Sequence, residues 1–362
     1  MQYRDRINKL IEDVDITLAD FTAERIRGNM PTQISSEFLT NKEQGDWAET
    51  TLLNGINENS SNLVAVRYGK SDDINAGDDG FKQFFESYQE ELDTIGKRPD
   101  ILIFEKTDFP YKTNDISCFP NNILDRLVPK AKCGIEVRSS AFLIDKYESY
   151  MNNKISCAIA TAMKSRSIIV NNYKDLLKSK DSALYNIIES ISPDNIHAIS
   201  FKARSWSSSA ELKELSNELK HLKNSINEIS KRTFLSITPK VEDLRVVYTW
   251  VQKYNVPHFY VQVFFDKAYG ISFERILNLI GTPDLEGKEY FIESDVKNQG
   301  KTTIKINASH ESNILEKIYL PEHYSEMKML SRGRLLFYVK FKDSVSVINK
   351  DGFENLLGIE LK

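Results

Sequence analysis

The sequence contains few of the residues that build disulfide frameworks, and it lacks membrane spans. Its 362 residues include only 3 cysteines, Cys118, Cys133 and Cys157, with no CxxC pair. An odd number of scattered cysteines is typical of reduced thiols, so we expect a cytoplasmic protein without disulfides. No stretch approaches the roughly 20 apolar residues needed to span a bilayer, and the polar N-terminus lacks the apolar run of a signal peptide.

The histidines and glycines of the sequence form no recognisable metal-binding or nucleotide-binding motif. The 5 histidines are scattered without HxH or HExxH spacing, which disfavours a zinc site. The 15 glycines form no GxxxxGK[ST] or GxGxxG loop, so the usual nucleotide-cofactor motifs are absent. Any chemistry is therefore expected to depend on carboxylates and basic side chains.

The formal net charge of −4 excludes a protein coated with basic residues, but the charge is unevenly distributed. Residues 1–150 contain 18 Lys and Arg against 27 Asp and Glu, a net charge of −9. Residues 151–362 contain 30 against 25, a net charge of +5. This asymmetry is compatible with ordinary solvated helix faces and also with a local surface that binds a polyanion, and the charge alone does not decide between them.

The hydrophobic pattern predicts an α/β protein with a central mixed β-sheet flanked by helices. Short apolar runs at 63–66, 101–104, 134–138, 234–238 and 259–265 are typical of strands, while 4–27, 45–57, 81–92 and 241–254 have helical spacing. A helical insertion and a mixed C-terminal region complete the chain. We expect the parts 1–141, 142–232 and 233–362, or one integrated domain that contains all three.

Within the insertion, residues 209–231 carry leucine and isoleucine at steps of three and four. This stripe predicts an amphipathic helix whose apolar face is a packing seam or, alternatively, a dimer element. The aromatic run 258–265 is expected to be a core strand.

The most informative pattern consists of acidic residues at two neighbouring strands. Arg98, Pro99 and Asp100 precede one strand, and Glu136, Val137 and Arg138 lie in the next. Side chains alternate along a strand, so Glu136 and Arg138 share a face, and Asp100 can point into the same cleft. Such carboxylates suit Mg²⁺ in phosphodiester hydrolysis. Alternatively, Asp100 is a strand-end cap, and Glu136 and Arg138 form a surface ion pair.

This arrangement resembles the PD-(D/E)xK nuclease pattern, and longer segments resemble the AccI family of type II restriction endonucleases. The similar segments span nearly the whole chain: PTQISSEFLTNKEQGDWAE (31–49), YGKSDDINAGDDGF (68–81), ELDTIGKRPDILIF (91–104), GIEVRSSAFLIDKYE (134–148), LSITPKVEDLRVVYTWV (235–251), NVPHFYVQVFFDKAYGISFE (255–274), NQGKTTIKIN (298–307) and SRGRLLFYVKF (331–341). The resemblance implies a restriction-endonuclease-like core and Mg²⁺-dependent cleavage of double-stranded DNA at a short, nearly palindromic site, leaving 5′-phosphate ends.

By the same resemblance, Asp100 and Glu136 are expected to bind Mg²⁺, and Glu49 is the acidic helix residue beside the site. Arg138 departs from the pattern, which expects lysine. Arginine stays protonated and cannot act as a general base, although it can contact a phosphate. Alternatively Lys240 supplies the lysine function, with Lys146 as a weaker candidate. We rank Arg138 narrowly ahead of Lys240.

The resemblance also implies partners. A palindromic site is matched most simply by a homodimer, and a cognate DNA methyltransferase is the functional partner of such an enzyme. Two rival interpretations are a structure-specific repair or recombination nuclease of the same fold and a catalytically inactive DNA-binding protein. The candidate DNA contacts are Ser139, Ser140, Lys202, Arg204, Arg332 and Arg334.

Overall fold

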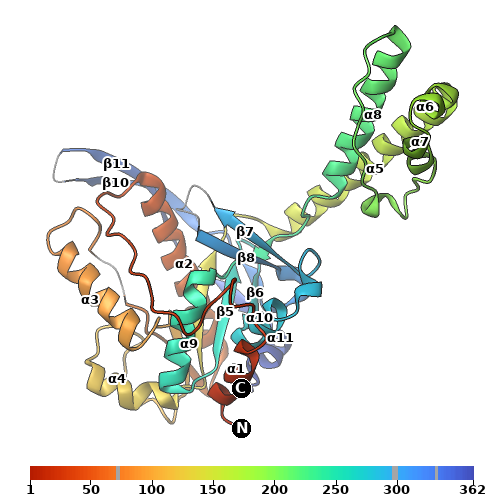
Figure 1. The fold of residues 1–362 in the computed structure, drawn as a ribbon. Coiled ribbons are helices and arrows are strands. Elements are labelled where there is room, and N and C mark those ends of the chain that lie inside the picture. The colour runs from red at the N-terminus through yellow and green to blue at the C-terminus, as the bar shows by residue number, and fades with distance from the viewer. Residues whose placement is uncertain (71–73, 296–300, 331–332) are drawn as a thin grey trace. The chain divides into compact units, whose positions relative to one another are not determined.

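The computed structural model describes residues 1–70, 74–295, 301–330 and 333–362, which form two compact units. The core unit comprises Met1–Ile144 and Leu235–Lys362, and the helical unit comprises Asp145–Phe234. Figure 1 shows the elements of both units. The described residues contain eleven α-helices, so the chain is a mixed α/β protein.

A seven-stranded mixed sheet forms the centre of the core unit. Only β3 and β5 among its neighbouring strands are parallel, and the other described pairs are antiparallel. The strands in sheet order are β1 (Leu63–Arg67), β2 (Ile101–Glu105), β3 (Cys133–Ser139), β5 (His258–Val263), β6 (Ala268–Ser272), β9 (Ser312–Ile318) and β12 (Ser346–Ile348). The predicted central mixed sheet is thereby confirmed.

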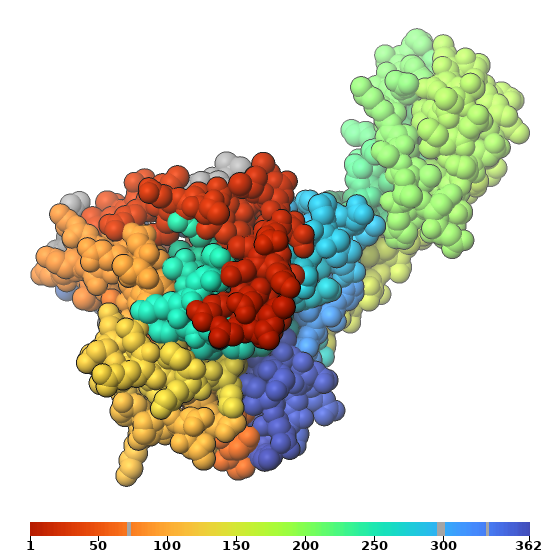
Figure 2. Space-filling model, turned by 60° about the horizontal axis from the view of Figure 1, so that its bottom comes forward, coloured from red at the N-terminus to blue at the C-terminus, as the bar shows by residue number. Residues whose placement is uncertain are grey.

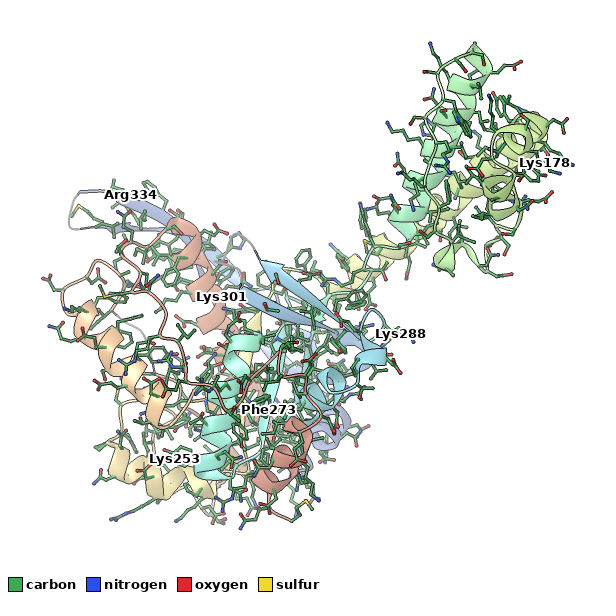
Figure 3. All side chains as sticks on the ribbon, viewed as in Figure 1. Lys178, Lys253, Phe273, Lys288, Lys301 and Arg334 are labelled. Atoms are coloured by element: carbon green, nitrogen blue, oxygen red, sulfur yellow. The ribbon has the colours of Figure 1, made fainter. Side chains whose placement is uncertain are left out.

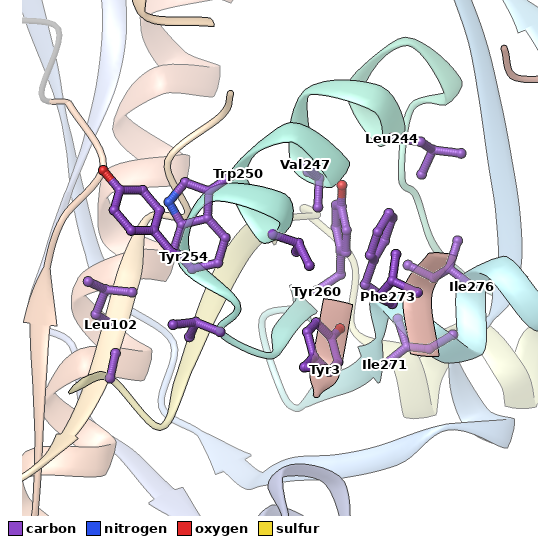
Figure 4. Close-up of a cluster of buried hydrophobic side chains, with 14 of the residues drawn as sticks. Tyr3, Leu102, Leu244, Val247, Trp250, Tyr254, Tyr260, Ile271, Phe273 and Ile276 are labelled. Atoms are coloured by element: carbon purple, nitrogen blue, oxygen red, sulfur yellow. The ribbon is translucent and has the colours of Figure 1, made fainter. Parts of the chain in front are cut away.

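Apolar side chains cover both faces of this sheet. Ile101 and Ile103 of β2 pack with one cluster, which includes side chains of α2 and α11, whereas Leu102 and Phe104 pack with another. The second cluster includes side chains of α1, α9 and α10 (Figure 4). The sequence of a strand that is buried on both faces is a nearly continuous apolar run, and β2 has such a sequence. The helices of the core unit are α1 (Tyr3–Ile11), α2 (Ser36–Asn59), α3 (Phe81–Thr94), α4 (Asn121–Leu127), α9 (Val241–Tyr254), α10 (Phe273–Ile280) and α11 (Lys350–Leu357).

Two small sheets account for the mixed character of the C-terminal region. A three-stranded sheet has the order β4-β8-β7, and a hairpin pairs β10 with β11. Figure 3 labels Lys301 at the start of β8 and Arg334 just before β11. The bounds are β4 (Ser236–Ile237), β7 (Tyr290–Asp295), β8 (Lys301–Asn307), β10 (Glu322–Met329) and β11 (Leu335–Lys342), with 3-10 turns η1 (Val128–Lys130), η3 (Pro283–Leu285) and η5 (Ala308–His310).

The helical unit has its own apolar core. It contains α5 (Ile144–Asn172), α6 (Lys174–Lys180), α7 (Ser182–Glu189), η2 (Ile196–Ala198) and α8 (Ala210–Ile229). All the apolar side chains of the predicted stripe on α8 are buried in this core, which confirms the packing seam. These side chains are therefore not available as a dimer face. The buried residues are Leu212, Leu215, Leu219, Leu222, Ile226 and Ile229.

The helix expected over 4–27 is wrong beyond its first turns, because α1 ends at Ile11. Asp15 accepts hydrogen bonds from the backbone and side chain of Thr17, and Asp20 does the same for Thr22. Such local bonds compete with helical hydrogen bonding. Figure 2 shows the N-terminal residues, in red, beside turquoise α9, and the Tyr248 hydroxyl donates to Asn8 Oδ1 at 3.1 Å.

The second helix begins earlier than its expected start at 45. The Ser35 side chain accepts a hydrogen bond from Phe38 N at 3.0 Å and caps α2 at Ser36. Serine is among the preferred N-cap residues. Across the residues that the structure describes, no helix has both the length and the apolar character needed to cross a membrane.

Candidate active site

A pocket of about 440 Å³ lies where β2 begins and β3 ends. Because β2 and β3 are antiparallel and pair Ile101 with Ile135, Asp100 comes level with the second half of β3. The side chains that line the pocket come from α2, the end of β1 and the residues after it, α3, the segment that precedes β2, and β3. They belong to Asn41, Lys42, Asp46, Glu49, Arg67, Lys70, Tyr88, Glu91, Lys97, Arg98, Asp100, Glu136, Val137, Arg138 and Ser139, with Gly45 and Gly69.

Asp100 is fixed to β3 by its own carboxylate. Its Oδ2 accepts a hydrogen bond from the backbone N–H of Val137 at 2.6 Å. Burial and the negative charges of Glu136 and Glu49 raise the pKa of Asp100 well above its ordinary value, although Lys97 and the Val137 N–H oppose them. An ionised Asp100 in this pocket therefore gains strongly from a nearby cation.

Glu136 points to the same face of β3 as Arg138 and is only 2% exposed. Its Oε1 lies 2.6 Å from Lys97 Nζ and 3.0 Å from Arg138 Nη2. The other carboxylate oxygen, Oε2, is buried and has no hydrogen-bond partner among the described residues. One oxygen of Glu136 is thus held by cations, and the other can accept a further ligand.

Asp243, in the first turn of α9, completes an alternating ring of charges. Its Oδ2 lies 3.0 Å from Lys97 Nζ and 2.7 Å from Arg138 Nη2, the two nitrogens that also contact Glu136 Oε1. Burial alone would raise the pKa of Asp243, but the charges of Lys97 and Arg138 hold it below its ordinary value. Asp243 is therefore ionised at neutral pH.

Both cations of this ring keep their protons. Burial and mutual repulsion disfavour a charged Lys97, yet Asp243 and Glu136 raise its pKa above the ordinary value. Burial also lowers the pKa of Arg138, and Glu136 and Asp243 reverse that effect. Lys97 and Arg138 can therefore stabilise negative charge, but neither is suited to remove a proton from water.

Glu49 lies on α2 and lines the same pocket. Burial raises its pKa to about 7, with smaller contributions from Asp46 and Glu136, and Arg67 opposes the shift. Its protonation therefore changes near neutral pH. The pocket brings Glu49 together with Asp100, Glu136 and Arg138, all expected from the sequence to be site residues.

The other predicted residues lie partly inside and partly outside the pocket. Lys240 precedes α9 and does not line the pocket, and burial lowers its pKa. Ser139 lines the pocket, whereas Ser140 follows β3 and donates its backbone N–H to Val263 O. The remaining predicted basic residues are Lys146, Lys202 and Arg204 in the helical unit, the exposed Arg334 before β11, and Arg332, which lies outside the described residues.

Sequence reasoning missed Lys97 and Asp243. Lys97 precedes Asp100 by three positions in an irregular segment, so no periodicity connects the two. Asp243 lies 105 residues beyond Arg138, and its contact arises only when α9 packs against the face of the sheet that carries Tyr260. The available signals were a lysine close to Asp100 and an acidic residue in the first turn of a helix.

The pocket supplies oxygen ligands for a hard cation, though not a complete cage. Asp100 and the free Oε2 of Glu136 are oxygen donors of the kind that Mg²⁺ prefers. In the described part of the chain, no cluster of three or more His, Cys, Asp or Glu side chains could hold a metal ion. Two carboxylates still fit Mg²⁺, which usually keeps several waters and is held by one or two carboxylates plus phosphate.

The sequence as a whole matches the family model described as AccI restriction endonuclease, over residues 1–362. No curated protein and no solved structure matches it. The family match confirms the resemblance seen in the sequence. The chain therefore belongs to the AccI restriction endonuclease family and is a type II restriction endonuclease, which hydrolyses DNA phosphodiester bonds at a specific sequence.

Proposed function

We propose that Asp100 and Glu136 hold Mg²⁺ in this endonuclease and that cleavage leaves 5′-phosphate ends. The single observation that carries this proposal is the free oxygen of Glu136, buried in the same pocket as Asp100. A buried carboxylate oxygen without a partner is costly unless a ligand satisfies it. Bound Mg²⁺ would neutralise charge on the scissile phosphate and lower the pKa of water.

Within this proposal, Lys97 supplies the function of the lysine that the nuclease pattern expects at position 138. Its Nζ contacts the proposed ligand Glu136 at 2.6 Å, whereas Lys240 lies outside the pocket lining. Arg138 contacts the phosphate beside it. Both side chains act as fixed positive charges toward the charge that develops on phosphorus-bound oxygens, because Glu136 and Asp243 keep both protonated. Glu49 completes the site as a third acidic group.

DNA contacts are proposed at Ser139, at the edge of the pocket lining, and at Ser140, Lys202, Arg204, Arg332 and Arg334. Lys202 and Arg204 belong to the helical unit, whose residues 145–234 contain 14 Lys and Arg against 10 Asp and Glu, a net charge of +4. Arg204 contacts Asp181 at 3.0 Å, so it must exchange this partner for a phosphate. Positive charge of this kind favours DNA through its phosphates.

The biological setting of the proposal follows from the family. The enzyme acts in the cytoplasm as a homodimer on a short, nearly palindromic site, and a cognate methyltransferase protects that site in the host DNA. In the proposed division of the chain, residues 142–232 form a domain inserted between two parts of the nuclease core, 1–141 and 233–362. A two-fold symmetric enzyme matches the symmetry of such a site.

Digestion of plasmid DNA tests the proposal. Supercoiled plasmid is incubated with the full-length protein in Mg²⁺ or in EDTA, and the ends are sequenced. We expect discrete fragments that share one short motif and carry 5′-phosphates, and only in Mg²⁺. Equal cutting in EDTA would contradict the metal requirement, nicking that follows DNA structure would indicate a repair-type nuclease, and no cutting with any divalent ion would contradict catalysis.

A further inference from the structure

We infer that Asp243 of α9 is a positioning residue for the cleavage reaction, because it holds Lys97 and Arg138 in place at Glu136. This inference rests on the proposed function of the pocket and adds a residue that the nuclease pattern does not contain. Asp243 itself does not touch the metal ligands, since its contacts are with the two cations.

The side-chain geometry is a closed ring of four atoms with alternating charge. Lys97 Nζ and Arg138 Nη2 each contact both Glu136 Oε1 and Asp243 Oδ2, at four N–O distances between 2.6 and 3.0 Å. Three of these contacts are charge-assisted hydrogen bonds, and the fourth, between Arg138 Nη2 and Glu136 Oε1, is an ion pair. Each cation is therefore fixed from two sides, by the strand that carries Glu136 and by the helix that carries Asp243.

The backbone also ties Lys97 to α9. Its N–H donates to Val246 O at 2.9 Å. The preceding residue, Gly96, has φ +80, and a Cβ there would lie 2.2 Å from Val246 O and 2.6 Å from Trp250 N. Only glycine permits both this conformation and this close approach. The segment before Asp100 is thus docked on the same helix that supplies Asp243.

The charge balance explains why Asp243 matters for the metal site. Lys97, Arg138, Glu136 and Asp243 together carry no formal net charge. Without the carboxylate of Asp243, the remaining three groups carry +1, and two mutually repelling cations share one oxygen of Glu136. A divalent cation is then bound less well at Glu136, and both cations lose the partner that orients them.

The test compares Asp243→Asn with Glu242→Gln in the full-length enzyme. Glu242 neighbours Asp243 in the same helical turn, is exposed and accepts a hydrogen bond from Thr302 N, so it is a matched loss of charge outside the ring. Three quantities are measured: kcat and KM on plasmid DNA in Mg²⁺, Mn²⁺ binding without DNA by electron paramagnetic resonance, and the melting temperature.

For Asp243→Asn we expect kcat to fall about 10–100-fold, with KM for DNA little changed and Mn²⁺ binding weakened about tenfold. Glu242→Gln should match the wild type, and Asp243→Glu should recover part of kcat because it restores the charge. If Asp243→Asn equals Glu242→Gln in kcat and in Mn²⁺ binding, the inference is wrong.

A double-variant cycle covers the case in which Asp243→Asn also lowers the melting temperature. If Asp243 acts through Lys97, the losses of kcat in Asp243→Asn and Lys97→Met are not additive, whereas additive losses would overturn the inference.

Variants of the proposed metal ligands distinguish failure of this inference from failure of the proposed function. If Asp100→Ala and Glu136→Ala still cleave DNA, the site assignment fails; if they do not and Asp243→Asn is normal, only the role of Asp243 fails.

Discussion

The Asp100 carboxylate accepts a hydrogen bond from the Val137 backbone N–H, with 2.6 Å between Oδ2 and N. This bond ties the residue before β2 to the middle of β3, directly beside Glu136. It uses one of the two carboxylate oxygens of Asp100. The two proposed metal ligands are therefore aligned by the pairing of β2 with β3.

Gly69 should be intolerant of even one added methyl group. A Cβ at this position would lie 3.0 Å from Asp100 Cα and 3.2 Å from Asp100 Oδ1, so Gly69→Ala should displace Asp100 and reduce cleavage more than tenfold. Gly45, in α2, lines the same pocket with no atom within 4 Å of an added Cβ. Gly45→Ala is thus the matched control, and single-turnover cleavage rates compare the two. Equal rates would mean that Asp100 can move without consequence.

The Lys97 side chain should supply a positive charge that cleavage requires. Lys97→Met is expected to reduce kcat by roughly 10²-fold or more, because a fixed positive charge beside Glu136 is lost. Arg138→Met should also reduce kcat, whereas Lys240→Met should leave it within a few-fold of the wild type, since Lys240 lies outside the pocket lining. A large loss in Lys240→Met with normal Lys97→Met would assign the lysine role to Lys240 instead of Lys97.

The strand pattern was sufficient to predict the position of the two carboxylates. Asp100 precedes β2 and Glu136 lies within β3, two largely buried strands, so their place in a covered sheet could be read from the sequence. The alternation of side chains also placed Arg138 on the face of Glu136. The alternation of side chains is a property of every strand, so it can be predicted without knowing how the rest of the chain packs.

Lys97 and Asp243 could not be predicted in the same way. Their contact joins an irregular segment to a residue that follows 146 positions later in the chain, and it depends on how α9 packs.

The prediction of one helix over 4–27 is wrong for a local reason. Its apolar spacing is helical, but the side chains of Asp15 and Asp20 bond their own neighbours and stop the helix locally.

Glu49 should make the stability of the metal-free enzyme depend on pH. The folded protein raises the pKa of Glu49 from its ordinary 4.5 to about 7, so folding favours the protonated form. Stability linked to this group is complete below about pH 4.5 and is lost as the pH rises through 7. Glu49→Gln does not titrate and should gain on the order of 1–3 kcal/mol over the wild type between pH 5 and pH 8.

Thermal unfolding in EDTA at several pH values measures this difference. Because the loss is confined to the titration of one carboxyl, the melting temperatures of Glu49→Gln and the wild type should converge at about pH 5 and separate at about pH 8. A separation that does not change over this range would show that Glu49 does not titrate in the folded enzyme near neutral pH.

The leucine stripe of α8 should contribute to stability and not to dimerisation. Leu219 is fully buried in the core of the helical unit, so Leu219→Ala should lower the free energy of unfolding by about 2–5 kcal/mol. The exposed neighbour Lys220 provides the control, Lys220→Ala. Denaturant unfolding measures the loss, and light scattering should give the same native mass for both variants. A change of mass in Leu219→Ala alone would assign the stripe to a subunit interface.

Cleavage by Asp100→Asn and Glu136→Gln tests the central claim most directly. Both variants keep the side-chain volume, and Glu105→Gln, a half-buried position at the end of β2, is the control for a lost carboxylate. We expect single-turnover cleavage in Mg²⁺ to fall by roughly 10³-fold or more in both variants, with binding of specific DNA retained and Glu105→Gln unaffected. If either variant cleaves at the rate of Glu105→Gln, the metal site is not at Asp100 and Glu136.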